Sequence, residues 1–369
     1  MTKIKGLSLV LVLVLILCLP VGVLGETPEE AWLAMPVPET SGEAAPTPRG
    51  GNEDPDTIII SAAGDCTLGG DAKSGDNRFA QYARKNGYAY FFSNVAEIFA
   101  GDDLTIINLE GPLTTAHRRR AGSVFNFRGL PEYSQILALG NVDAATVANN
   151  HRLDFGAAGA RDTIKHLEEA GIKSFGMKRT AIVEIKGVKI GLMGLTKWDH
   201  KLKEAADMAA ELKKDCDLLI CTIHWGEELN YKATRNQKGM AKAAISGGAD
   251  LVLGSHPHVL GGIEFIDGKP VVYSLGNFCF GGNSNPTDKR TMIFQQTYHI
   301  LPEGGVRRGE CKVIPCTVST RPDTNDYRPT PAKGETYKGI MKRINHLSTQ
   351  FEDHPVLPLE APEQAGGTG

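Results

Sequence analysis

The residues of this chain best suited to chemistry lie in five polar clusters, each at the end of a short apolar run. The clusters are Gly64-Asp65, Asn108-Leu109-Glu110, Asn149-Asn150-His151, His224-Trp225-Gly226 and His256-Pro257-His258. Carboxylates, amides and imidazoles are the side chains that hard and borderline divalent cations prefer. One such cluster alone has little meaning, but five in equivalent places predict a metal centre.

The cluster at residues 149–151 is difficult to explain by packing alone. It combines two amides with an imidazole, and each buried polar group needs a partner. Asn150 can bind a metal through its carbonyl oxygen, while His151 can bind a metal or donate a proton to a leaving group. Asn149 and Asp154 are expected to support them. The alternative is a hydrogen-bond network that caps the helix expected to follow.

Three histidines follow two of the apolar runs. His224 by itself is more typical of a hydrogen-bonded core histidine than of a metal ligand. His256 and His258 favour ligation, because in an extended chain their imidazoles lie on one side and can reach one metal or two. Together the three predict metal ligation.

Four weaker candidates complete the set: Asp65, Asn108, Glu110 and Asn277. Asp65 precedes a glycine-rich turn, where a carboxylate can point at a cation without crowding, although a turn-forming aspartate is an equal alternative. Asn108 and Glu110 project to the same side of an extended chain. Asn277 is available to orient a ligand, and a simple turn amide explains it equally well.

A site of this composition suits the hydrolysis of phosphate esters. Two divalent cations would activate a bridging water and neutralise the phosphoryl oxygens, while His151 protonates the leaving group. The chain has no Gly-x-Ser-x-Gly elbow and no Walker-type phosphate loop. Nucleophilic-serine and P-loop chemistry therefore have no support.

The elements that must position these clusters are short strands alternating with helices. Strands are predicted at residues 57–61, 104–107, 142–147, 217–221 and 249–253, and helices at 157–170, 205–214 and 237–246. Open α/β sheets bind ligands at the carboxyl ends of their strands, so the clusters could converge on one site. An Asp267-Gly268 hairpin and a β-rich stretch at 292–318 follow. We expect a layered α/β fold with a mixed sheet or two packed sheets.

The N-terminus has the layout of a secretory signal. Lys3 and Lys5 precede an apolar stretch at 7–19, and either cleavage or retention as a membrane anchor is open. In both cases we expect an extracytoplasmic protein, secreted or anchored to the membrane. The predicted organisation is a signal peptide or anchor at 1–25, a disordered linker at 26–55, the α/β domain at 56–320, a C-terminal extension with a helix at 321–352, and a disordered tail at 353–369.

Charge and cysteine content limit the partners and the redox chemistry. The formal net charge is −3, which gives no broad basic field, so nucleic acid is not an expected partner. Arg118-Arg119-Arg120 is either a solvated loop or a local anchor for an anionic ligand. Cys311 and Cys316 are a plausible local disulfide pair, because export permits disulfides.

At these clusters the sequence resembles the CapA family, proteins linked to poly-γ-glutamate capsule synthesis that adopt a calcineurin-like metallophosphoesterase fold. The resemblance is carried by residues 64–65, 69–70, 108–114, 148–156, 224–228, 254–258 and 273–278. It covers residues 57–318 and implies a four-layer α/β/β/α sandwich with mixed sheets in a membrane-associated, outward-facing protein.

The resemblance also implies roles for the candidate residues. Asp65 and His258 would bind a first divalent metal; Asn150, His224 and His256 would bind a second; Glu110 would replace the usual bridging aspartate; and His151 would be the general acid. Thr67 stands where the family pattern of metallophosphoesterases has a histidine, so the first site lacks a ligand. One or two divalent metals are expected, with Mn, Fe, Zn and Mg not distinguished.

The function implied is that of an exported CapA-like protein in the synthesis, export or attachment of an anionic capsule polymer, poly-γ-glutamate, through a metal-dependent site. One alternative is a non-catalytic accessory or polymer-binding subunit of a synthase complex. Another is a general extracytoplasmic metal-dependent phosphodiesterase. The expected partners are the polymer and membrane subunits of a polymer synthase.

Overall fold

Two mixed β-sheets form the centre of the domain in the computed structural model, which describes residues 50–76 and 78–360. The first sheet has eight strands in the order β16-β15-β14-β1-β3-β5-β6, with β13 also paired to β1. Its strands are β1 (Thr57–Thr67), β3 (Leu104–Leu109), β5 (Ala144–Thr146), β6 (Lys173–Phe175), β13 (Asn277–Phe280), β14 (Arg290–Ile300), β15 (Val306–Thr317) and β16 (Thr330–Pro331). β1, β3, β5 and β6 are parallel, whereas β14 and β15 are antiparallel.

The second sheet has six strands in the order β11-β12-β10-β9-β8-β7. These are β7 (Ala181–Ile185), β8 (Val188–Thr196), β9 (Leu218–His224), β10 (Leu251–Ser255), β11 (Ile263–Ile266) and β12 (Lys269–Val272). The four central strands are parallel and the two edge strands are antiparallel. A small separate pair, β2 (Gly70–Asp71) with β4 (Phe127–Arg128), stands apart from both sheets.

Alternating side chains of the central strands show that the two sheets pack face to face. In β9, Leu218 and Ile220 join the core shared with Ile58 and Ile60 of β1, while Leu219 points to the opposite face. Successive strand residues point to opposite faces, so these runs must be apolar on both sides. Three apolar cores result, one between the sheets and one on each outer face.

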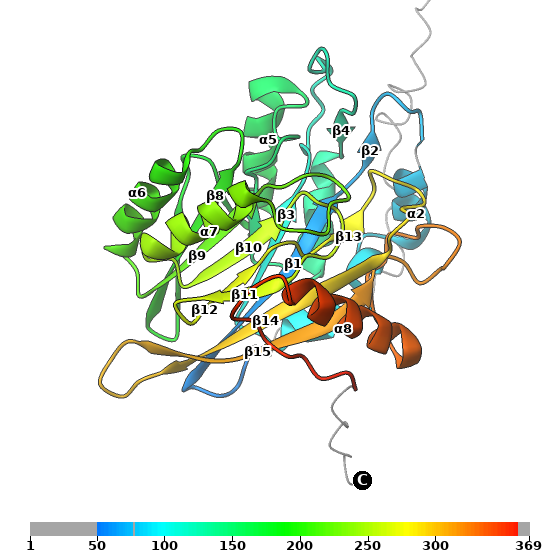
Figure 1. Ribbon diagram of the computed structural model, residues 1–369. Coiled ribbons are helices and arrows are strands. Elements are labelled where there is room, and N and C mark those ends of the chain that lie inside the picture. The colour runs from blue at the N-terminus through cyan, green and yellow to red at the C-terminus, as the bar shows by residue number, and fades with distance from the viewer. Residues whose placement is uncertain (1–49, 77, 361–369) are drawn as a thin grey trace, which may run out of the picture. The chain divides into compact units, whose positions relative to one another are not determined.

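Helices cover both outer faces (Figure 1). The first sheet is covered by α2 (Arg78–Asn86), η1 (Ala89–Phe92), α3 (Ala96–Ala100), η2 (Pro131–Tyr133), α4 (Ser134–Leu139) and α5 (Gly156–Glu169), and the second by α6 (Leu202–Lys213) and α7 (Arg235–Ser246). α8 (Gly334–Ser348) packs against β15 and β11 and inserts its apolar face into the core between the sheets. This arrangement confirms the expected four-layer α/β/β/α fold with mixed sheets.

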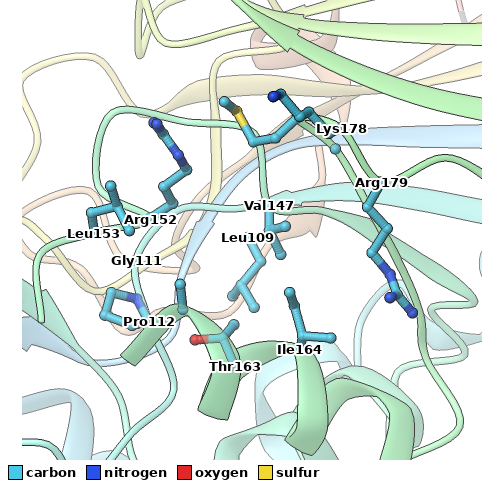
Figure 2. Close-up of a pocket in the computed structure, with 13 residues that line it drawn as sticks. Leu109, Gly111, Pro112, Val147, Arg152, Leu153, Thr163, Ile164, Lys178 and Arg179 are labelled. Carbon is cyan, nitrogen blue, oxygen red and sulfur yellow. The ribbon is translucent and has the colours of Figure 1, made fainter. Parts of the chain in front are cut away.

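Only part of the apolar face expected on α5 enters a core. Leu167 is fully buried, whereas Ile164 on the same helix is half-buried and lines a pocket (Figure 2). The expected hairpin joins β11 to β12, and both turn residues have positive φ, 51° for Asp267 and 71° for Gly268. That geometry is typical of a type I′ turn.

The expected disulfide does not form, because Cys311 and Cys316 are both free thiols of strand β15. Residues five apart on one strand point to opposite faces. Cys316 belongs to the helix-covered core, and Cys311 packs against the core between the sheets.

The packed part of the chain continues beyond the C-terminal boundary predicted from the sequence. Leu357 is buried against the central core, and its N–H donates to Asn345 Oδ1 of α8 at 2.9 Å, so part of the predicted tail packs on the domain. The predicted signal or anchor, most of the linker and residues 361–369 lie outside the described residues. Within residues 50–76 and 78–360, no helix combines the length and apolar character that a membrane span needs.

Candidate metal centre

The candidate residues come from both sheets and meet at the carboxyl ends of their parallel strands. Asp65 lies in β1, and Glu110 directly follows β3 of the first sheet. His224 ends β9 of the second sheet, and His256 and His258 follow β10. Because parallel strands end at one edge of a sheet, two facing sheets bring both sets of side chains to one place.

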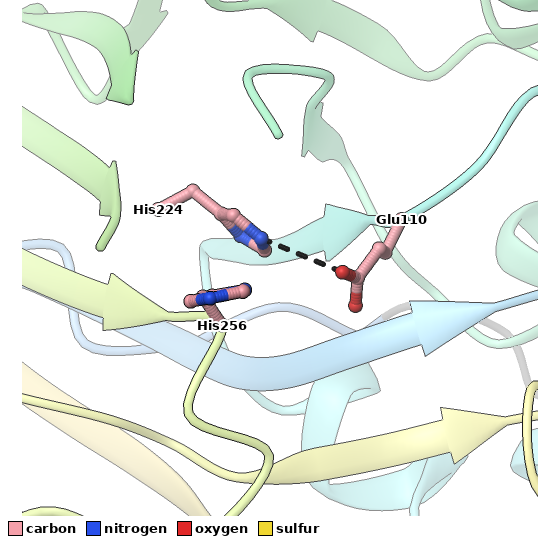
Figure 3. Close-up of side chains that lie close together, drawn as sticks. All are labelled: Glu110, His224 and His256. Carbon is pink, nitrogen blue, oxygen red and sulfur yellow. Dashed lines mark ion pairs between the residues drawn. The ribbon is translucent and has the colours of Figure 1, made fainter. Parts of the chain in front are cut away.

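Glu110, His224 and His256 form a fully buried group whose possible ligand atoms all lie within 4.8 Å of one another (Figure 3). His224 Nε2 is 3.4 Å from Glu110 Oε1, and the rings of His224 and His256 are 4.8 Å apart between centroids. A carboxylate and two imidazoles are suitable ligands for a borderline cation such as Zn²⁺.

A second group shares Glu110 with the first. His258 Nδ1 lies 3.3 Å from Asp65 Oδ2 and 3.8 Å from Glu110 Oε2. Asn277 Oδ1 is 2.8 Å from the same nitrogen and so orients the ring. The shared carboxylate stands between the two groups, where a bridging ligand would be.

The atoms that face this space are those that a cation would satisfy. Both carboxylate oxygens of Glu110 and Nδ1 of His256 are buried, and no hydrogen bond within the described residues satisfies them. A buried carboxylate without a hydrogen-bond donor is costly in free energy. The residues therefore fit a divalent cation.

Electrostatics keep the carboxylates charged and one imidazole neutral. Burial tends to raise the pKa of Asp65 and of Glu110, but nearby imidazoles outweigh it and lower both pKa values. Burial disfavours the charged form of His258, yet Glu110 and Asp65 raise its pKa to about 10. Burial and the charge of His224 lower the pKa of His256 to about 2, so His256 keeps a free lone pair.

Three amides link these ligands. Asn150 Oδ1 lies 2.9 Å from His224 Nε2, at the edge of the first group. The buried Asn149 donates to Asn108 Oδ1 at 3.2 Å and to the Leu109 carbonyl at 2.7 Å. Asn108 in turn donates to Asp65 Oδ1 at 2.7 Å. Asn108 and Asn149 thus connect Asp65 to the end of β3 through hydrogen bonds.

His151 forms a buried pair with Asp154 beside the centre. Its Nδ1 lies 2.6 Å from Asp154 Oδ2, which also accepts the Phe127 N–H at 2.7 Å. The alternative of a helix-capping network is wrong, because the N-cap of α5 is Phe155, whose side chain makes no capping hydrogen bond. His151, His258 and Asn277 line one pocket of ≈ 290 Å³.

The histidine pair does not adopt the extended conformation expected from the sequence. His256 and His258 have φ values of 94° and 58°, which belong to the left-handed region. The His256 N–H turns inward and donates to Asp65 Oδ2 at 3.1 Å. Strained backbone of this kind persists only where its surroundings hold it. Asp65 also differs from expectation, since β1 continues through it to Thr67.

Sequence reasoning missed two residues of this centre, Ser255 and Trp198. Ser255 Oγ lies 2.8 Å from His224 Nδ1, and the ring of Trp198 lies edge-on 4.9 Å from His256 while half of Trp198 is exposed. Arg120, which the sequence did single out as part of an arginine triplet, donates to the Asn150 carbonyl at 3.0 Å. Trp198 carried a usable signal, because it follows the apolar strand β8 as the other clusters follow theirs.

Comparison with known proteins identifies the family. Residues 59–282, more than half of the chain, match the family model "Bacterial capsule synthesis protein PGA_cap". The PGA biosynthesis protein CapA of Bacillus subtilis is 27% identical over 319 residues, covering 80% of this chain and 79% of the relative. The capsule biosynthesis protein CapA of Bacillus anthracis is 26% identical over 276 residues, covering 67% of this chain and 65% of that relative.

Among solved structures, the Haemophilus influenzae NAD nucleotidase is similar at 13% identity, with a TM-score of 0.38, covering 81% of this chain and 64% of that one. The family match alone is decisive, because it spans the strand ends that supply every ligand candidate. The chain belongs to the bacterial capsule synthesis protein family PGA_cap.

Proposed function

We propose that this protein acts outside the cytoplasm on an anionic polymer, poly-γ-glutamate, through a metal-dependent site during synthesis, export or attachment of the polymer. The observation that carries the proposal is Glu110, whose buried oxygens have no hydrogen-bond partner in the part of the chain that the structure describes and lie between two groups of imidazoles and carboxylates. Membership of the family and the names of the Bacillus relatives support the polymer as the substrate class.

The loop between β3 and β4 supports an anionic substrate. Arg118, Arg119 and Arg120 are exposed on this loop, and it continues into Phe125 and Phe127, which line the pocket of His151. An exposed guanidinium row beside a pocket attracts carboxylates and can bind them in a bidentate manner. The triplet fits the second of its two sequence interpretations, a local anchor for an anionic ligand.

The residues around the pocket would have two separate roles, metal binding and proton transfer. Asp65, Glu110, Asn150, His224, His256 and His258 would hold one or two divalent cations. When bound, such a cation polarises an oxygen of the substrate or lowers the pKa of water. Asp154 holds His151 through Nδ1, which leaves Nε2 to carry the proton delivered to a leaving group.

A non-catalytic role is the second candidate, and one residue favours it. Thr67 occupies a buried position next to the centre, and its hydroxyl has no hydrogen-bond partner among the described residues. A threonine there supplies no imidazole to the group of Asp65 and His258. A protein with an incomplete centre would bind polymer, or stabilise a synthase complex, without turnover.

The deciding experiment measures metal content and turnover in the same preparation. Purified protein and its His256→Ala variant are analysed for bound metal and assayed on phosphodiester and γ-glutamyl substrates. The exposed His346 of α8 offers a matched control, His346→Ala. We expect His256→Ala alone to lose metal and turnover.

Each outcome separates the candidates. Turnover on γ-glutamyl substrate supports the catalytic proposal, and turnover on phosphodiesters alone supports a general phosphodiesterase. Tight metal binding without turnover on either substrate supports the accessory role. A protein that binds no divalent metal would overturn the metal-dependent function altogether.

A further inference from the structure

An apolar pocket of ≈ 290 Å³ lies outside the metal centre (Figure 2). It is formed by the end of β3, the segment after β5, helix α5 and the turn after β6, and it shares no lining residue with the pocket of His151. Its walls include Leu109, Val147, Leu153, Ala160 and Ile164. The pocket is therefore a separate feature that the proposed function does not use.

Of the apolar wall residues named, only Leu109 is fully buried in a core, and the other four are half-buried. Ala160 and Ile164 lie on the face of α5 next to the buried Leu167, yet both remain half-buried, as do Val147 and Leu153. Concave apolar surface that stays in contact with water is typical of a binding site for apolar groups. These walls suit an aliphatic chain.

Three cations stand at the rim of this pocket, and two of them are already paired. Arg152 is 3.3 Å from an Asp199 oxygen, and Arg179 forms an ion pair with Glu168. Lys178 is exposed, and the described part of the chain supplies its ammonium group with neither an ion pair nor a hydrogen bond. The rim thus has one uncompensated positive charge beside an apolar interior.

We propose that this pocket binds an amphiphilic anion, with its aliphatic chain between α5 and the strand ends and its anionic head at Lys178. The ligand is either a free amphiphile or a membrane lipid, since both offer the same chemistry. Binding here is independent of the metal centre, although Leu109 of the wall directly precedes Glu110.

The primary test is calorimetric titration of the full-length protein, in detergent-free buffer, with alkyl phosphates of increasing length. Burial of each methylene contributes about 0.8 kcal/mol, so affinity should rise about fourfold per added methylene from butyl to octyl phosphate until the pocket is full. Inorganic phosphate tests the head alone, and octanol tests the chain alone. Octanol binding as tightly as octyl phosphate would refute the role of Lys178.

Variants on α5 and at the rim assign the site. Ala160→Leu fills the pocket and should weaken octyl phosphate binding at least about tenfold, whereas Ala158→Leu, at an exposed position of the same helix, should not. Lys178→Gln should weaken binding about fivefold, and Lys165→Gln, which removes an exposed charge elsewhere on α5, should have no effect. Wild-type affinity in both Ala160→Leu and Lys178→Gln would overturn the proposal.

Competition with vesicles distinguishes the two sources of ligand. If phosphatidylglycerol vesicles displace octyl phosphate more than phosphatidylcholine vesicles do, the ligand is a membrane lipid. Equal, weak displacement by both vesicles, with octyl phosphate still bound, identifies a free amphiphile. If no alkyl phosphate binds, the proposed binding site is refuted.

Discussion

Replacing Glu110 by glutamine separates metal binding from folding, because the substitution should weaken metal binding strongly and change the stability of the metal-free protein little. The substitution removes the carboxylate shared by the groups of His256 and of His258, so it weakens every cation site built on it. Losing even a supporting residue of a metal site costs about 10–100-fold in affinity, and we expect about 100-fold for this ligand.

The substitution should change the stability of the metal-free protein little. Glutamine removes a buried carboxylate that no described residue satisfies with a hydrogen bond, which stabilises the fold. It also removes the attraction of this carboxylate to His224 at 3.4 Å, which destabilises the fold. Both contributions are on the order of 1–3 kcal/mol, so they largely cancel. The melting temperature without metal should change by no more than about 2 °C.

The shift in melting temperature that bound metal causes follows from the linkage between binding and folding. At a metal concentration of about 100 times Kd, binding stabilises the folded protein by about 2.7 kcal/mol. About 310 described residues imply an unfolding entropy of about 0.65 kcal/mol/K, so the melting temperature should rise by about 4 °C. A variant with 100-fold weaker binding should gain only about 0.6 °C at the same concentration.

Differential scanning fluorimetry with Mn²⁺ and Zn²⁺ after chelation measures these shifts, and elemental analysis gives the stoichiometry. Asp143→Asn is the control, because Asp143 accepts the Thr105 N–H far along the strand from the centre, and its loss should lower both melting temperatures equally. A metal-induced shift of wild-type size in Glu110→Gln would refute the assignment of Glu110 as the shared ligand.

Three further predictions concern Asp154, Leu357 and the two cysteines of β15. Asp154→Asn should lower turnover about 100-fold while metal content stays unchanged, because Asp154 acts through His151; a parallel loss of metal contradicts this role. Leu357→Ala should cost about 2–3 kcal/mol of unfolding free energy in a denaturant titration, and no change would mean that the tail is not packed. Mass spectrometry under non-reducing conditions should find both Cys311 and Cys316 as free thiols. A mass lower by about 2 Da, which a disulfide between them would cause, would contradict the strand geometry.

Patterns of adjacent residues predicted the fold class and most of the centre. Each central strand, such as 218–224, has to be apolar on both faces when helices and a second sheet cover it, so it is visible as an uninterrupted apolar run. The polar residues that end such runs are buried at a strand end, which is why Asp65, Glu110 and His224 could be named without coordinates.

Other features depended on contacts that no local pattern encodes. Cys311 and Cys316 are close in sequence, but the alternation of β15 separates them. His256 and His258 leave the extended conformation because the His256 N–H bonds to Asp65, 191 residues away in the chain. Trp198 reaches His256 only because β8 and β10 belong to one sheet.

The sequence by itself determined which side chains could bind a cation and that each lies near the end of a strand, since residue type and apolar periodicity are local properties. Only the tertiary structure decided that Glu110 is shared between two groups, that His151 pairs with Asp154 rather than with a helix terminus, and that α5 leaves an apolar pocket beside Lys178. The physical reason is that these relations depend on how two sheets pack against each other. Packing is set by the sum of many long-range contacts.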